Sequence, residues 1–231
     1  MLKTERMDRV RAALRAQGLT QMIVCDPKSV WYLTGVAVEP YERLLALYLP
    51  TEGEPVLFLN RLFNVPEPPC RTVWHTDTDK PVAQIAEVVD AGRPLGIDKE
   101  WPAKFLIPLM ETHPGMQVVL SSDCVDDCRA CKDAEEQTLM REASRINDAV
   151  NEAAKHYIKA GMTEREVAEF IDAQFRAHGC EGPSFTTIVS FGANAADPHH
   201  EPDDTVLKEG DCVLFDMGCV KSRYCSDMTR T

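Results

Sequence analysis

The 231-residue sequence lacks any apolar run long enough to cross a membrane and any cluster of Lys and Arg. A bilayer-spanning helix needs about 20 apolar residues, and a secretory signal needs an apolar core, whereas residues 1–18 carry charges throughout. Internal repeats and low-complexity tracts are also lacking. The net charge of −12 argues against nucleic acid or an anionic membrane as the main partner. We therefore expect a globular cytoplasmic protein that binds neither nucleic acid nor membranes.

The nine cysteines do not resemble the disulfide framework of a small secreted protein, because their number is odd and they are scattered through the chain. Three of them, Cys124, Cys128 and Cys131, have the CxxxCxxC spacing by which three thiolates hold a four-iron cluster. Neighbouring aspartates would repel an anionic cluster, and a structural zinc would need a fourth ligand from an unidentified distant residue. We interpret the stretch as a linker and helix start with reduced thiols.

The length of the chain predicts two domains. Residues 1–128 alternate short apolar runs with helical patterns and include a predicted hairpin at 44–60, which indicates a mixed α/β domain. From Asp133 the pattern becomes one long helix, and a second helix opens with the capping box Thr163–Glu166. Strands follow, so residues 129–231 form the second domain and the fold class is α/β (α+β).

Two aspartates are the strongest candidates for chemistry. Asp216 ends an apolar strand, where an ionised and unpaired carboxylate is costly. Asp227 lies in a later extended segment, and Gly218 allows close approach of the backbone, so two antiparallel strands would bring both carboxylates together. Such a pair suits two divalent ions. Ion pairs with Arg223 or Arg230 are the alternative, and spacing alone does not decide between them.

His199 and His200 lie in the loop SFGANAADPHHEPDD, one hairpin before the strand of Asp216. A histidine in a loop is usually a solvated side chain. Its nearness in sequence to the two aspartates makes this loop a candidate part of the same site.

These segments resemble those of a known family, the pita-bread metallopeptidases, which include Xaa-Pro aminopeptidases, Xaa-Pro dipeptidases (prolidases), methionine aminopeptidases and creatinases. LKEGDCVLFDMGCVKSRYCSDMTRT is similar to the family's first metal-binding hairpin, and FTTIVSFGANAADPHH to the segment before it. DPKSVWYLTGV, with YERLLALYLP and PVLFLN behind it, resembles the creatinase-type N-terminal domain of the Xaa-Pro branch. The resemblance implies a creatinase-like domain at 1–128 and the first half of a pita-bread domain at 129–231. Creatinases do not keep the metal-binding aspartates, and this sequence has both.

By this resemblance the protein is a di-metal exopeptidase that hydrolyses the bond between an N-terminal residue and proline, as an aminopeptidase or a dipeptidase. Asp216 would bind one ion, Asp227 would bridge both, and His199 would contact the substrate. Tyr224 and Arg230 are expected to steer the carboxylates. Of the two divalent ions, manganese is the first expectation and zinc or cobalt the alternatives, because oxygen ligands discriminate poorly among them. The expected partners are a peptide with proline in second position and a second copy of the chain in a homodimer.

The sequence also departs from the family pattern. Arg223 stands where glycine commonly precedes the tyrosine, and Phe191 where a small residue often precedes the glycine. The family takes one histidine and two glutamates from the second half of its fold, and none of His75, His113, His156 and His178 has a matching context. We therefore expect residues 1–231 to be a fragment that is inactive by itself, completed by a longer chain or by a second polypeptide.

Two other functions stay open at this point. One is a non-catalytic relative that uses its cleft to hold a peptide or a partner protein. The other is a creatinase-like hydrolase or lyase on the same scaffold. The presence of both aspartates favours the peptidase.

Overall fold

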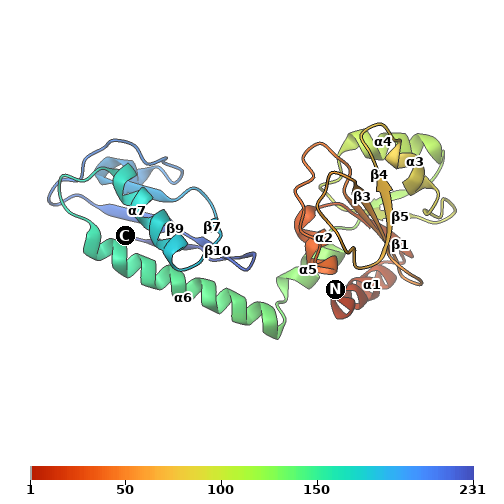
Figure 1. The fold of residues 1–231 in the computed structure, drawn as a ribbon, viewed down its shortest axis with the longest axis horizontal. Helices are drawn as coiled ribbons and strands as arrows, with labels where there is room; N and C mark the ends of the chain where they lie inside the picture. The colour runs from red at the N-terminus through yellow and green to blue at the C-terminus, as the bar shows by residue number, and fades with distance from the viewer. Residues whose placement is uncertain (1) are drawn as a thin grey trace. The chain divides into compact units, whose positions relative to one another are not determined.

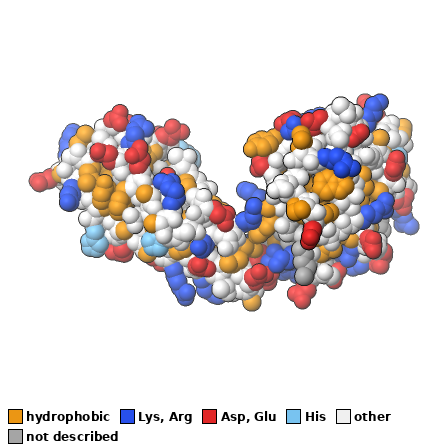
Figure 2. Space-filling view, viewed as in Figure 1, with side chains coloured by type: hydrophobic (Ala, Val, Ile, Leu, Met, Phe, Trp, Pro, Cys, Tyr) orange, Lys and Arg blue, Asp and Glu red, His pale blue; other side chains and the backbone are white. Residues whose placement is uncertain are grey.

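A computed structural model describes residues 2–231, and the chain divides into two compact units (Figure 1). The first unit ends at Cys131, and the second comprises Lys132–Thr231. Each unit combines helices with β-sheet, so the α/β class predicted from the sequence is confirmed. Acidic and basic side chains are interspersed on the visible surface of both units (Figure 2). No helix among residues 2–231 has the length and apolarity that a membrane crossing requires.

One mixed sheet of six strands forms the first unit, in the order β4-β3-β2-β1-β5-β6. The strands are β1 (Gln21–Val24), β2 (Ala46–Pro50), β3 (Val56–Asn60), β4 (Arg71–His75), β5 (Leu95–Ile97) and β6 (Val118–Leu120). Strand β2 pairs antiparallel with both β1 and β3, which confirms the predicted hairpin. The β3–β4, β1–β5 and β5–β6 pairs are parallel.

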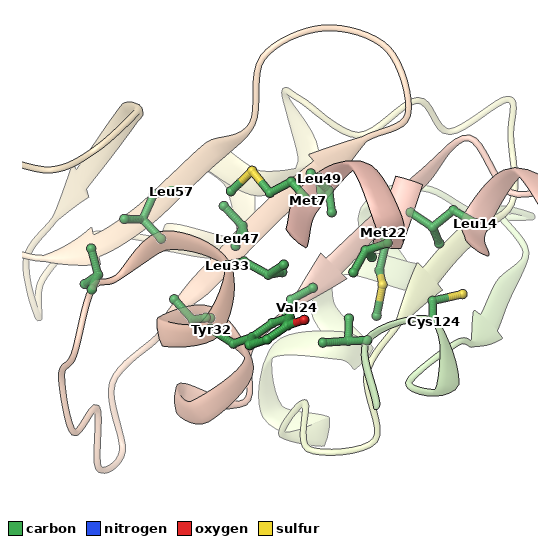
Figure 3. Close-up of a cluster of buried hydrophobic side chains, with 14 of the residues drawn as sticks. Met7, Leu14, Met22, Val24, Tyr32, Leu33, Leu47, Leu49, Leu57 and Cys124 are labelled. Atoms are coloured by element: carbon green, nitrogen blue, oxygen red, sulfur yellow. The ribbon is translucent and has the colours of Figure 1, made fainter. Parts of the chain in front are cut away.

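Helices cover both faces of this sheet, which explains the nearly uninterrupted apolar runs of its central strands. The helices are α1 (Thr4–Ala16), α2 (Pro27–Thr34), α3 (Pro81–Ala86), α4 (Ala103–Thr112) and α5 (Asp123–Ala130). Along β2, Leu47 and Leu49 pack with α1, α2 and α5, whereas Ala46 and Tyr48 pack with α3 and α4. Figure 3 shows the first of these two clusters, to which Met7 of α1 belongs.

The first unit extends past the domain boundary that the sequence analysis set at Cys128, because all of α5 packs within this unit. At the start of α2, Asp26 Oδ2 and Ser29 Oγ accept hydrogen bonds from Arg129 Nη1 at 3.2 and 3.0 Å. The backbone carbonyls of Cys128 and Cys131 accept from Arg9 of α1. The stretch interpreted as a linker and helix start is therefore a helix that packs within the first unit.

The second unit packs two helices against two three-stranded sheets, ordered β12-β9-β8 and β11-β10-β7. Its elements are α6 (Ala134–Tyr157), α7 (Glu164–Ala177), β7 (Gly182–Pro183), β8 (Ile188–Phe191), the 3₁₀ helix η1 (Gly192–Ala196), β9 (Val213–Met217), β10 (Cys219–Lys221), β11 (Tyr224–Cys225) and β12 (Met228–Arg230). Capping boxes begin both helices, with Asp133 and Glu136 at α6 and Thr163 and Glu166 at α7. The capping box predicted for α7 is thus confirmed.

Strand β9 carries Asp216 and lies between β8 and β12, antiparallel to both. Phe215 and Met217 are buried in the core that α6 and α7 cover. Because successive strand side chains alternate between the two faces, Asp216 points away from these helices. Thr229 of β12 lies directly opposite Asp216.

Gly218 allows the chain to approach itself closely just after β9. A Cβ atom at this position would lie 2.0 Å from the Ser226 carbonyl oxygen and 2.3 Å from Ser184 Oγ. The close approach predicted from the sequence is therefore present. The extended segment Tyr224–Cys225, however, pairs with β10 in the other sheet, and β12 is the strand that lies beside Asp216.

Replacing Gly218 by alanine should lower the free energy of unfolding by about 2 kcal/mol, because the added methyl group has no space and the surrounding backbone must move. Urea unfolding of residues 1–231 measures this change. Gly92→Ala is the matched control, since its Cβ would meet only an Asp90 carboxylate oxygen, at 3.2 Å. Equal losses in the two variants would contradict the close-approach explanation.

Candidate metal centre and active site

Asp216 is half-buried on β9 and has one carboxylate oxygen engaged. Its Oδ1 accepts a hydrogen bond from Thr229 Oγ1 at 2.8 Å. Within residues 2–231, Oδ2 has no hydrogen-bond donor, and no Lys or Arg forms an ion pair with this carboxylate. Thr229 therefore orients the carboxylate and leaves one oxygen available for a cation.

Asp227 is exposed and directly precedes β12. Extending the β9–β12 register by one residue pairs Asp227 with Gly218. Alternation along the extended chain then puts Asp227 on the same face as Thr229 and Asp216. Strand β12 is an edge strand in the described sheet, and a cavity of about 410 Å³ lies between this edge and α6. The hairpin thus presents two carboxylates on one open face.

His199 follows η1 in the loop between β8 and β9 and is exposed. In the described part of the chain its imidazole has no hydrogen-bond partner, while its backbone N–H donates to Asp197 Oδ1 at 2.9 Å. The loop leaves β8 at Phe191, which pairs with Val213 at the start of β9. Asp216 lies about 10 Å further along β9, at about 3.3 Å per residue. One sheet therefore carries both the histidine loop and the metal-binding candidate.

Glu164, in the first turn of α7, is a fully buried carboxylate. It lies with His200 and Asp203 in a group whose possible ligand atoms are all within 4.8 Å of one another. Glu164 Oε1 accepts from Phe191 N at 2.7 Å and Asn194 Nδ2 at 3.0 Å. Its Oε2 accepts from His200 Nε2 at 2.6 Å and Asp203 N at 3.1 Å. Since a carboxylate has about four lone-pair sites, these donors saturate it.

The hydrogen-bond partners of His200 Nε2 indicate that this ring nitrogen carries a hydrogen. Asn194 Nδ2 lies within hydrogen-bond distance of Glu164 Oε1, of Thr205 Oγ1 and, at 3.2 Å, of His200 Nε2. The shorter contact of His200 Nε2, at 2.6 Å, is with Glu164 Oε2, and a carboxylate oxygen accepts hydrogen bonds. His200 Nε2 therefore carries its own hydrogen and donates it to Glu164. Hydrogen bonds from Thr205 hold the pKa of Asp203 below its usual value. The group fits a hydrogen-bonded anchor of the loop better than a metal site, because no lone pair of Glu164 is left for an ion.

Sequence reasoning missed Glu164. A glutamate in the first turn of a helix, beside a capping box, is typically an exposed side chain that interacts with the helix dipole. Its burial depends on the loop 192–204, which folds over it.

The two residues expected to steer the carboxylates have other partners. The Tyr224 hydroxyl donates to Glu136 Oε1 at 2.9 Å. Arg230 is paired with Phe215, so its side chain starts from the sheet face opposite Asp216, and its Nη1 donates to the Thr229 carbonyl at 2.8 Å. In the described residues the side chain that contacts Asp216 is Thr229, which the sequence analysis did not name.

The three CxxxCxxC thiols do not converge. Cys124 is buried among core side chains (Figure 3), Cys128 is half-buried and Cys131 is exposed. Burial raises the pKa of Cys124 to about 11 and also raises that of Cys128, so both thiols stay protonated near neutral pH. None of the nine cysteines, which all lie within residues 2–231, forms a disulfide bond. The interpretation of reduced thiols is consistent with this geometry.

Comparison with known proteins decides the family. Residues 6–131 match the creatinase/prolidase N-terminal domain, and residues 138–231 match metallopeptidase family M24. The chain belongs to family M24, in the group with a creatinase/prolidase N-terminal domain. The pita-bread resemblance inferred from the sequence is confirmed.

Three similar proteins illustrate the relationship. An uncharacterized peptidase of Staphylococcus aureus is 34% identical over 219 residues, which cover 90% of this chain and 60% of the relative. The structure of dipeptidase PepE from Mycobacterium ulcerans is 30% identical, with a TM-score of 0.89 over 98% of this chain and 63% of that one. A prolidase from Thermococcus sibiricus is 29% identical, with a TM-score of 0.90 over 100% of this chain and 65% of that one. The chain thus spans less than two thirds of the length of these relatives.

The hairpin fits the divalent metal ions that family M24 uses. Carboxylate oxygens are the hard ligands that such ions prefer. Asp216 and Asp227 share one face, and neither forms an ion pair with a Lys or Arg of residues 2–231. These two side chains are therefore the candidate metal ligands of this hairpin.

Asp216→Asn should weaken binding of Mn²⁺ to residues 1–231 by at least about 10-fold, because the variant loses a charged ligand. The asparagine Oδ1 can still accept from Thr229, so the fold should be kept. Isothermal titration with MnCl₂ measures the change. Glu169→Gln, on the exposed surface of α7, removes the same charge and should bind as the wild type does. Unchanged Mn²⁺ affinity in Asp216→Asn would refute the assignment.

Proposed function

We propose that residues 1–231 form part of a metal-dependent exopeptidase that hydrolyses the bond between an N-terminal residue and proline, as a dipeptidase or an aminopeptidase. The observation that carries this proposal is the β9–β12 hairpin, where Asp216 and Asp227 share one face of the sheet from which the loop of His199 starts. The names of the similar proteins, a dipeptidase and a prolidase, support the substrate class.

Two divalent ions are proposed at this hairpin, with manganese preferred over zinc or cobalt because the named ligands are carboxylate oxygens. Bound ions of this kind activate water as a nucleophile and polarise the scissile carbonyl. The contribution of the chain is orientation. Thr229 holds Asp216 Oδ1 at 2.8 Å and keeps Oδ2 directed away from that hydrogen bond, while Asp227 is proposed to bridge both ions.

His199 is proposed to bind the peptide substrate. Its imidazole is exposed and unengaged within the described chain, so a ring N–H is available to donate to a peptide carbonyl or to the oxyanion that develops from it. Asp197 fixes the backbone at this residue through the 2.9 Å hydrogen bond to the His199 N–H. A donor held in place in this way stabilises developing charge without reorganisation.

We further propose that residues 1–231 are inactive by themselves. Two aspartates offer too few donors for two ions, each of which takes about four to six ligands. Purified residues 1–231 should therefore bind Mn²⁺ weakly and leave Xaa-Pro peptides intact, and hydrolysis of such peptides by this polypeptide would contradict the idea. A homodimer and a cytoplasmic location, where free thiols persist, complete the proposal.

In the natural full-length protein loaded with Mn²⁺, His199→Ala should lower kcat for an Xaa-Pro dipeptide by about 100-fold, since one oxyanion-stabilising donor contributes about this factor. The bound manganese should be unchanged, because His199 is assigned to substrate and not to metal. Proline release and metal analysis measure the two quantities. His156→Ala, an exposed histidine on α6, is the control.

The same experiment separates the peptidase from its rival. If the wild-type protein binds Mn²⁺ and peptide but releases no proline, the protein is a non-catalytic peptide-binding member of the family and the proposed function is wrong. Loss of manganese in His199→Ala would instead overturn only the role given to that histidine.

A further inference from the structure

The buried carboxylate of Glu164 ties together both ends of the loop that carries His199. On one side of His199 it accepts from Phe191 N and from Asn194 Nδ2. On the other side it accepts from His200 Nε2 and from Asp203 N. One side chain of α7 thus makes four hydrogen bonds that bracket the proposed substrate-binding histidine.

This carboxylate forces the loop into one arrangement. A carboxylate that is buried without hydrogen-bond partners is strongly unfavourable. Moving the loop away from Glu164 would remove these partners and therefore raise the free energy of the protein. The position at the N-terminus of α7 adds a favourable interaction with the helix dipole. All four of its hydrogen-bond partners are N–H donors, one of which is the imidazole of His200.

Backbone hydrogen bonds also join the start of α7 to the end of this loop. Glu164 N donates to the Thr205 carbonyl at 3.2 Å, and Arg165 N donates to the Asp203 carbonyl at 3.1 Å. The stretch between Asn194 and His200 is therefore anchored at both ends, and the exposed side chain of His199 projects from the anchored segment.

We propose that Glu164 is a positioning residue for His199. Through Asn194 and His200 it holds the loop so that the imidazole of His199 meets the substrate in one orientation. Glu164 does not itself touch the substrate. The inference rests on the proposed role of His199 in Xaa-Pro hydrolysis.

Glu164→Gln tests the proposal with little change in volume. The amide keeps one acceptor oxygen, but in either orientation its NH₂ group faces one of the two donor pairs, Phe191 N–H with Asn194 Nδ2 or His200 Nε2 with Asp203 N–H. The tether on one side of His199 is therefore lost. The matched control is Glu166→Gln, in the same helical turn, where glutamine can still complete the capping box with Thr163.

Hydrogen exchange on residues 1–231 provides a measurement that does not depend on activity. Backbone amides of residues 192–204 should exchange faster in Glu164→Gln by about 10-fold or more, with the amides of β8 and β9 unchanged and Glu166→Gln equal to wild type. Exchange as slow as in the wild type would overturn the proposal. If Glu164→Gln fails to fold, His200→Ala, which removes one tether, is measured with the same criterion.

Kinetics of the natural full-length protein with Mn²⁺ test the link to His199. Glu164→Gln should lower kcat by between about 10- and 100-fold with KM and bound manganese unchanged. In the His199→Ala background the same change should have no further effect, because Glu164 acts through that histidine. An additional loss of equal size in that background would overturn the proposal. If the wild-type protein hydrolyses no Xaa-Pro peptide, the proposed function fails, and the exchange rates alone decide whether Glu164 orders the loop.

Discussion

The antiparallel pairing of β9 with β12 is the constraint on which the candidate site depends. It puts Thr229 opposite Asp216 and directs Asp227 to the same face. The pairing in turn depends on Gly218, because any side chain there would collide with the Ser226 carbonyl. Two carboxylates that are 11 residues apart in sequence are thus directed to the same face of one sheet.

Two carboxylates of the second unit, those of Glu164 and Asp216, differ in burial and in how many of their lone pairs are occupied. Glu164 is completely buried and its oxygens accept hydrogen bonds from four N–H donors, so no lone pair is left for a ligand. Asp216 is half-buried, and the single hydrogen bond from Thr229 leaves an oxygen unengaged. Proximity of acidic and histidine side chains therefore does not identify a metal site. The number of carboxylate lone pairs that are still available distinguishes Asp216, which could bind a cation, from Glu164, which could not.

Burial also corrects the interpretation of the cysteine motif. Spacing in sequence would allow Cys124, Cys128 and Cys131 to share a cluster, but α5 directs Cys124 into the core and leaves Cys131 exposed. The hydrogen bonds of Arg129 and Arg9 hold this helix to α1 and α2, so the stretch is part of the first unit and not a linker. These partners are 100 to 122 residues away in sequence, and local patterns contain no signal of them.

The sequence by itself determined the α/β class, the hairpin of β2 and β3, the capping box of α7 and the metallopeptidase family. Periodicity, capping residues and motif spacing are local properties. They can be recognised without knowing which distant segments of the chain are in contact. Only the tertiary structure decided that Thr229 orients Asp216, that Tyr224 hydrogen-bonds to Glu136, and that Glu164 anchors the loop of His199. Each of these is a contact between elements that are distant in sequence or paired across strands, and its energy depends on burial and on which lone pairs are already filled.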